Sequence, residues 1–128
     1  MKRSVVHTNK IPPLKIPLSQ AIKVGDWIYT SGMLGTDPAT GGLVPGGIEA
    51  EARQVCEHLK AVLEAGGSSL QDVHKVLIYL VDLTELPLLN KVFGEYFPND
   101  PPARTTFRAA GLVMDARVEI EAIATVKG

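Results

Sequence analysis

The chain has 128 residues, of which 45% are hydrophobic and 21% charged, and its formal net charge is −1. This composition predicts one soluble globular domain over residues 1–128 and argues against a disordered chain. The 13 Lys and Arg residues are scattered, which argues against a nucleic-acid-binding face. No apolar run approaches the length of a membrane span and no signal-peptide core is seen. No membrane association is therefore expected, and the cytoplasm is the default location.

Three short strands are expected in the first quarter of the chain, at residues 4–8, 21–24 and 27–31. Gly25 and Asp26 separate the last two and form a plausible hairpin turn. The proline-rich segment between the first two strands should be extended and lie on the surface. A stretch rich in Gly, Pro, Asp and Thr follows the third strand and predicts a long loop.

The clearest helix is expected at residues 48–65, because apolar residues recur there at steps of three and four. Gly66 and Gly67 should end it. Thr84 is the expected N-cap of a second helix, with Pro87 in its first turn. The buried stripe of that second helix is predicted to consist of Leu86, Leu89, Phe93, Tyr96 and Phe97.

Residues 73–81, 104–109 and 117–126 are the remaining strand candidates, so the predicted order is β-β-β-α-β-α-β-β. Two helices and one sheet indicate a two-layer α+β domain with both helices on one face. Both faces of the last strand carry apolar residues, whereas two helices can cover only one face of the sheet. We therefore expect the other face to be buried against another subunit.

Charged residues interrupt the most apolar part of the sequence. Arg104 follows a proline pair, and Glu119 and Glu121 lie in a strand otherwise made of Val, Ile and Ala. Burying such charges costs free energy unless they are paired or serve in binding or catalysis. Arginine binds carboxylates with a two-pronged fork, and a nearby glutamate moves protons or positions water. Arg104 and Glu119 therefore indicate a site for a small carboxylate, with a structural ion pair as the alternative. Glu121 is assigned to structure, as a partner of an arginine.

Five segments, taken in order, resemble the Rid family of reactive-intermediate deaminases, also called the YjgF or perchloric-acid-soluble-protein family. Each is weak alone, but together they span nearly the whole chain. The segments are Leu18-Ser19-Gln20-Ala21, Ile28-Tyr29-Thr30-Ser31-Gly32, Asp37-Pro38-Ala39-Thr40-Gly41, Pro102-Ala103-Arg104 and Val118-Glu119-Ile120-Glu121-Ala122-Ile123-Ala124.

This resemblance implies a chorismate-mutase-like α+β fold that assembles as a homotrimer around a central barrel, with active sites between subunits. It implies hydrolysis of enamine and imine intermediates, such as 2-aminoacrylate, 2-iminopropanoate and 2-iminobutanoate, to 2-keto acids and ammonia. No cofactor is implied. Endoribonuclease or translation inhibitor is a label that the family has also carried, and the dispersed basic residues offer it little support.

The resemblance also assigns roles to residues. It implies that Arg104 grips the substrate carboxylate and that Glu119 handles water and protons. Thr106 is implied at a position where backbone groups bind substrate or water, and Ser31 and Asn90 are implied to line the cleft. An imine is intrinsically electrophilic, so orientation, protonation and delivery of water are enough for its hydrolysis.

Two residues depart from the family pattern. Leu18 stands where a tyrosine is common, so substrate choice and rate are open, and a more apolar substrate or a non-catalytic binding role are alternatives. Met33 follows Ser31-Gly32 where glutamine is common, and it is expected to alter the pocket wall or a subunit contact. Cys56 is expected to be a small core residue. The three histidines lack metal-ligand spacing, so no metal is predicted.

Overall fold

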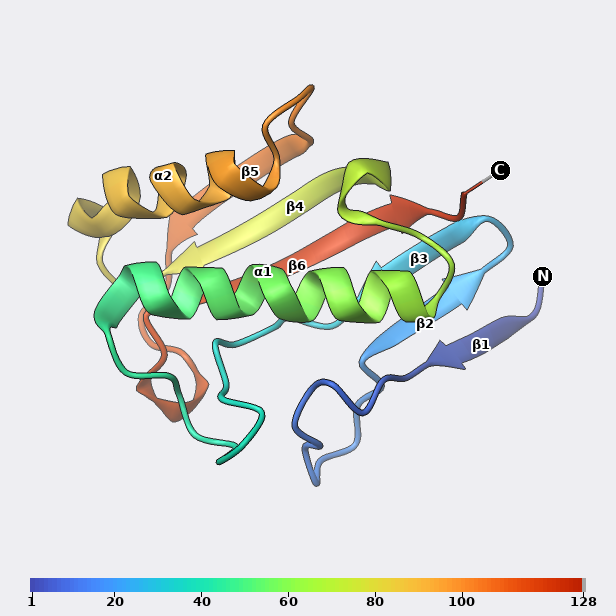
Figure 1. Ribbon diagram of the computed structural model, residues 1–128, viewed down its shortest axis with the longest axis horizontal. Coiled ribbons are helices and arrows are strands. Elements are labelled where there is room, and N and C mark those ends of the chain that lie inside the picture. The colour runs from blue at the N-terminus through green and yellow to red at the C-terminus, as the bar shows by residue number, and fades with distance from the viewer. Residues whose placement is uncertain (128) are drawn as a thin grey trace.

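A computed structural model describes residues 1–127 and shows an α+β arrangement of one mixed six-stranded sheet and two helices (Figure 1). The order β-β-β-α-β-α-β-β is as predicted, and the predicted strand ends lie within two residues of the observed ones. The elements are β1 (Arg3–Val6), β2 (Ala21–Val24), β3 (Trp27–Thr30), α1 (Gly47–Ala65), β4 (Val73–Leu80), α2 (Leu86–Tyr96), β5 (Ala103–Arg108) and β6 (Val118–Thr125).

The strand order across the sheet is β1-β2-β3-β6-β4-β5. Neighbouring strands are antiparallel except β4 and β5, which are parallel because α2 carries the chain back between them. The last strand, β6, therefore lies in the middle of the sheet, between β3 and β4. This central position explains why the β6 residues that face the helices are all apolar.

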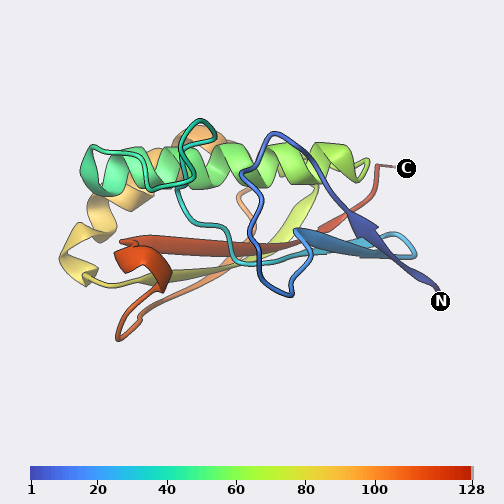
Figure 2. The ribbon, with the colours of Figure 1, turned by 90° about the horizontal axis from the view of Figure 1, so that it is seen from below.

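Both helices cover the same face of the sheet (Figure 2). In β6, Val118, Ile120, Ala122 and Ala124 are buried on that face, while the alternating residues are half-buried on the other. In α1, the predicted apolar stripe packs on the sheet, and Leu59, Val62 and Leu63 are fully buried there. The face opposite the helices carries exposed aromatic side chains, namely those of Trp27, Tyr29 and Phe107.

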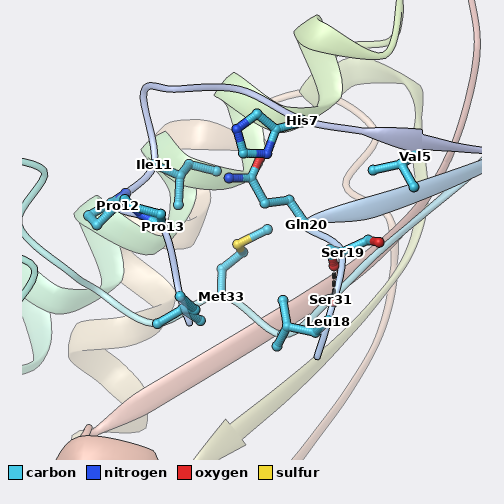
Figure 3. A pocket seen from close by; sticks show the side chains of 12 residues that line it. Val5, His7, Ile11, Pro12, Pro13, Leu18, Ser19, Gln20, Ser31 and Met33 are labelled. Carbon is cyan, nitrogen blue, oxygen red and sulfur yellow. Dashed lines mark hydrogen bonds between the residues drawn. The ribbon is translucent and has the colours of Figure 1, made fainter. Parts of the chain in front are cut away.

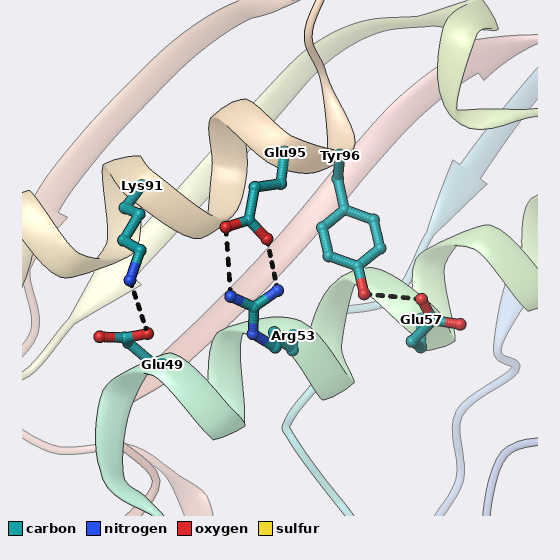
Figure 4. A network of polar contacts seen from close by, with 6 residues as sticks. All are labelled: Glu49, Arg53, Glu57, Lys91, Glu95 and Tyr96. Atoms are coloured by element: carbon teal, nitrogen blue, oxygen red, sulfur yellow. Dashed lines mark hydrogen bonds and ion pairs between the residues drawn. The ribbon is translucent and has the colours of Figure 1, made fainter.

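A row of polar contacts joins the outer surfaces of α1 and α2 (Figure 4). These contacts link the two helices. Because they are partly exposed, each adds little to the free energy of unfolding. The pairs are Lys91 with Glu49 at 3.4 Å, Arg53 with Glu95 through two hydrogen bonds, and the Tyr96 hydroxyl with Glu57 at 2.6 Å.

The start of the second helix differs from the prediction, because Thr84 is not its N-cap. Asp82 accepts a 2.9 Å hydrogen bond from the Thr84 amide and caps a short 3-10 turn, Leu83–Glu85. The α-helix begins after that turn, at Leu86, without a side-chain cap. An aspartate two residues earlier therefore took the capping role, since its carboxylate satisfies the amide group directly.

A buried carboxylate fixes the beginning of β6. Glu51 of α1 is 5% exposed, and its Oε1 atom accepts a 2.9 Å hydrogen bond from the backbone N–H of Arg117. The Arg117 side chain in turn forms a 2.8 Å ion pair with Glu85. This arrangement ties the long helix to the residue that immediately precedes β6. Within residues 1–127, no helix is long and apolar enough to cross a membrane.

Candidate functional site

The six residues proposed for the site fall into two groups within one chain. Leu18, Ser31 and Glu119 line a cavity at the edge where β3 leaves β6. Asn90, Arg104 and Thr106 lie where α2 packs against β5. The fold of one chain therefore places the two groups on opposite faces of the sheet.

Glu119 is half-buried, and its carboxylate lies against the backbone of Gly32. A Cβ atom added at Gly32 would lie 2.0 Å from Glu119 Oε2, so a side chain at this position would force the carboxylate to move. Burial raises the pKa of Glu119 above its ordinary value of 4.5, and the negative charge of neighbouring Glu121 adds to that effect. A carboxyl group in this state exchanges protons more readily near neutral pH than an exposed one.

The segment after β3 holds Gly32 in that position. The Thr30 hydroxyl accepts a 3.0 Å hydrogen bond from the amide of Ala122, where regular β3–β6 pairing stops. Three residues later, Met33 resumes backbone pairing with Ile120, at 2.8 and 3.2 Å. Ser31 and Gly32 thus bulge away from β6 and open the space beside Glu119.

Ser31 is held by the segment that leads into β2. Its amide donates to the carbonyl of Gln20 at 2.9 Å, and its hydroxyl donates to the carbonyl of Ser19 at 2.6 Å (Figure 3). The hydroxyl proton is therefore committed to the backbone, and the oxygen lone pairs remain for a ligand. Ser31 acts in this structure as a support of the cavity wall.

Two adjoining cavities of about 250 and 170 Å³ share a wall made by residues 31–33 and Leu18. Leu18 is 44% exposed and lies at the entrance of both. Figure 3 shows Met33 and Leu18 among the residues that line the smaller cavity. Met33 lines both cavities, which is compatible with the pocket-wall alternative for this residue. Glu119 lines only the larger cavity.

Glu121 was expected to pair with an arginine, but its partner in the structure is a tyrosine. The hydroxyl of Tyr79 on β4 donates a short hydrogen bond to Glu121 Oε1. This bond, together with burial, raises the pKa of Tyr79 to about 12. The two strands are adjacent and both side chains point away from the helices, which explains why the tyrosine is the nearest donor.

Arg104 is held by two residues of α2. Its Nη2 atom donates a 2.7 Å hydrogen bond to Asn90 Oδ1, and its guanidinium carbon lies 5.2 Å from the centre of the Phe93 ring. Among residues 1–127, Arg104 forms no ion pair with a carboxylate. Burial lowers the pKa of Arg104 from its ordinary value, yet an arginine stays charged in water. A positive charge is thus oriented and left uncompensated.

Thr106 lies two residues further along β5, on the same face as Arg104. Its Oγ1 atom is buried and has no hydrogen-bond partner within residues 1–127. Buried hydroxyls are nearly always bonded, so this one marks a place where a ligand or water atom fits. The proposed site role of Thr106 is compatible with this position.

Arg104 and Glu119 do not meet within one chain, and no ion pair joins them. Arg104 pairs in register with Val76 and contacts α2, so it belongs to the face covered by the helices. Glu119 pairs with Tyr79, whose ring packs on Phe107 on the opposite face. Strand β4 also separates β5 from β6. The structural ion pair considered from the sequence is therefore absent from the described residues.

Two contributors to the site could not be identified as such from the sequence. Phe93 was predicted only as part of a buried stripe, although its ring also supports the Arg104 guanidinium. Gly32 was noted within a motif and given no role, although it makes the space for Glu119. A glycine directly after a strand was the available signal for close backbone approach.

Among residues 1–127, no three His, Cys, Asp or Glu side chains gather closely enough to hold a metal ion. His58 is buried, and its Nε2 atom lies 2.8 Å from the carbonyl oxygen of Thr36. Cys56 is buried as expected, and burial raises its pKa to about 12, so it is a poor nucleophile.

The chain matches a protein-family model described as Endoribonuclease L-PSP over residues 8–126. It is 44% identical to a RutC family protein of Pyrococcus abyssi, covering 97% of this chain and 98% of that protein. It is 41% identical to a Mus musculus protein named 2-iminobutanoate/2-iminopropanoate deaminase, and the match covers 95% of this chain and 90% of that protein.

Solved structures of similar chains have the same fold. RidA from an Antarctic Psychrobacter species superposes with a TM-score of 0.92 at 41% identity, covering 96% of this chain and 99% of that one. TdcF of E. coli, solved with bound serine, superposes with a TM-score of 0.92 at 30% identity, and the match covers 97% of this chain and 99% of that one. The chain therefore belongs to the Rid family, also named YjgF, L-PSP or RutC.

Proposed function

We propose that this protein hydrolyses enamine and imine forms of 2-amino acids to 2-keto acids and ammonia. Water adds to the C=N carbon, and the resulting carbinolamine loses ammonia and forms the C=O bond. One imine and one water thus give one keto acid and one ammonia. For 2-aminoacrylate, tautomerisation to 2-iminopropanoate precedes this step and pyruvate is the product. The deaminase relatives at about 41% identity support this assignment.

In this proposal Arg104 binds the substrate carboxylate. Asn90 occupies one N–H of its guanidinium and Phe93 supports its plane, so the remaining N–H groups are oriented before substrate arrives. The unpaired hydroxyl of Thr106 lies on the same face and supplies a further contact. Asn90 thus positions Arg104.

Glu119 is proposed to move the protons. As a carboxylate it removes a proton from the attacking water, and as the acid it returns that proton to the departing nitrogen. Its raised pKa supports this double use, because both protonation states are then accessible nearer to neutral pH. Gly32 and Ser31 keep the carboxylate at the cavity rather than in open solvent.

The single observation that carries the proposal is the separation of these two charges. Arg104 and Glu119 lie on opposite faces of one sheet, so a site that uses both needs two chains. We propose a homotrimer with a chorismate-mutase-like protomer fold, in which the sheet face bearing Trp27, Tyr29 and Phe107 turns inward. Exposure of these three aromatic side chains supports burial of that face in an assembly.

Hydrolysis can be tested by coupling. An amino-acid oxidase or a threonine dehydratase generates the imine, and the rate of keto-acid formation is followed with and without the purified protein. Arg104→Ala should abolish the acceleration because it removes the carboxylate anchor. Arg108→Ala is the matched control, since Arg108 is on the same strand and, among residues 1–127, its side chain donates to the carbonyl of Val81 alone. Full activity in Arg104→Ala would refute the assigned role.

A non-catalytic carboxylate-binding role is the second candidate. Bound serine in E. coli TdcF favours a small amino-acid-like ligand, and Leu18 lacks the hydroxyl common at its position. Thermal stabilisation by 2-oxobutanoate, together with no turnover of any imine, would support binding alone.

A further inference from the structure

The larger cavity beside Glu119 is lined mainly by apolar side chains. Its volume of about 250 Å³ is large enough to hold several water molecules. Leu14, Ile16 and Leu18 come from the proline-rich segment before β2 and form one side. Met33 and Val113 come from two other segments and complete the apolar wall around the carboxylate.

This inference rests on the proposed function. A planar imino acid carries three substituents at its reacting carbon, and two of them are assigned to charged groups. The carboxylate is directed to Arg104, and the nitrogen is directed to Glu119. The third substituent is the substrate side chain, and the apolar wall at Leu18 is the surface left for it.

The polar groups at the back of the same cavity are already bonded to each other. His58 Nε2 lies 2.8 Å from the carbonyl oxygen of Thr36 and 3.1 Å from its hydroxyl. Burial also lowers the pKa of His58, so its ring is neutral at pH 7 and does not attract an acidic side chain. A polar substrate side chain therefore finds few free partners, whereas an apolar one displaces water from apolar surface.

We propose that the preferred substrates are 2-imino acids with apolar side chains of three or more carbons, and that Leu18 determines this preference. The reaction remains hydrolysis of one C=N bond by one water, with release of one ammonia. A methyl side chain would leave most of the cavity filled with water. Each further buried methylene increases discrimination by about 10-fold or more.

A panel of imines tests this preference. L-Amino-acid oxidase generates the imines of alanine, 2-aminobutyrate, leucine, methionine and glutamate, and kcat/KM is measured for each above the spontaneous rate. The leucine- and methionine-derived imines should exceed the alanine-derived imine by at least about 10-fold. Hydrolysis with equal or greater kcat/KM for alanine would overturn the preference and leave the proposed function standing. Hydrolysis of none would overturn both.

The role of Leu18 is tested by filling the cavity entrance. Leu18→Trp should reduce the leucine-to-alanine ratio of kcat/KM by at least about 10-fold, because the larger ring occupies space for the substrate side chain. Leu83→Trp is the matched control, since Leu83 is 46% exposed in the turn before α2 and lines neither cavity. An unchanged ratio in Leu18→Trp, in folded protein that still hydrolyses the alanine-derived imine, would overturn this assignment.

Discussion

Arg104 and Glu119 lie on opposite faces of the same sheet, separated by strand β4 and by three positions of register. Arg104 is level with Val76, whereas Glu119 is level with Tyr79. Side chains directed to opposite faces cannot grip one small substrate from within a single chain. If the two charges serve one site, as proposed, that site is formed where one protomer meets another.

Replacement of Gly32 tests the close approach of the backbone to Glu119. In Gly32→Ala, the new Cβ would meet the carboxylate at 2.0 Å, so Glu119 must move. We expect kcat to fall by about 100-fold or more, since a displacement of about 1 Å is enough for such a loss. Gly94→Ala is the control, because nothing lies near its Cβ and alanine favours helix. Unchanged kcat in Gly32→Ala would contradict the assigned position of the carboxylate.

Asn90→Ala tests the orientation of Arg104. Loss of the 2.7 Å hydrogen bond frees the guanidinium, and bonds to charged groups contribute about 1.5–3 kcal/mol. We expect KM to rise by about 10-fold or more with a smaller change in kcat, because carboxylate binding weakens and the proton transfers are untouched. Steady-state kinetics with Asn99→Ala, an exposed amide, provide the comparison. A pure loss of kcat would assign Asn90 a different role.

The raised pKa of Glu119 predicts a dependence of stability on pH. The folded state holds this proton more tightly than the unfolded state, so the stabilising contribution is complete below pH 4.5 and is lost as pH rises through the folded pKa. Glu119→Gln removes this loss. Urea unfolding measured from pH 4.5 upward should show that the free energy of unfolding of the variant rises relative to that of wild type as pH rises. Glu64→Gln, on the exposed face of α1, should run parallel to wild type.

Glu51→Ala tests the tie between α1 and β6. The amide of Arg117 would lose its buried acceptor, which costs about 1–3 kcal/mol. We expect the free energy of unfolding, measured with urea, to fall by that amount, while the exposed Glu64→Ala changes it little. Equal effects of the two substitutions would show that Glu51 is not a structural anchor.

Sequence patterns predicted the strands and α1 well, because hydrophobic periodicity records burial directly. The apolar residues on the second face of β6 also indicated that this face is not fully exposed to solvent. The N-cap at Thr84 was wrong because Asp82, two residues earlier, offers a competing acceptor that shortens the helix from its start. Propensity alone does not rank two capping residues that lie two positions apart.

The sequence suggested a set of candidate site residues, but it could not give their arrangement. Arg104 and Glu119 were expected together because both interrupt apolar strands, but strand register and order decide which face each occupies. Similarly, Glu121 was expected to pair with an arginine, and the neighbouring strand supplies Tyr79 instead. Pairing across a sheet depends on contacts distant in sequence, which periodicity does not encode.

Mixing two inactive variants tests the two-chain site most directly. Arg104→Ala and Glu119→Gln are co-expressed, and imine hydrolysis by the mixed assembly is compared with that of each variant alone. If Arg104 of one protomer serves Glu119 of another, random mixing in equal amounts restores about one quarter of the wild-type sites. Activity near that level is predicted. Activity no higher than that of either variant alone, in assemblies shown to contain both chains, would contradict the account.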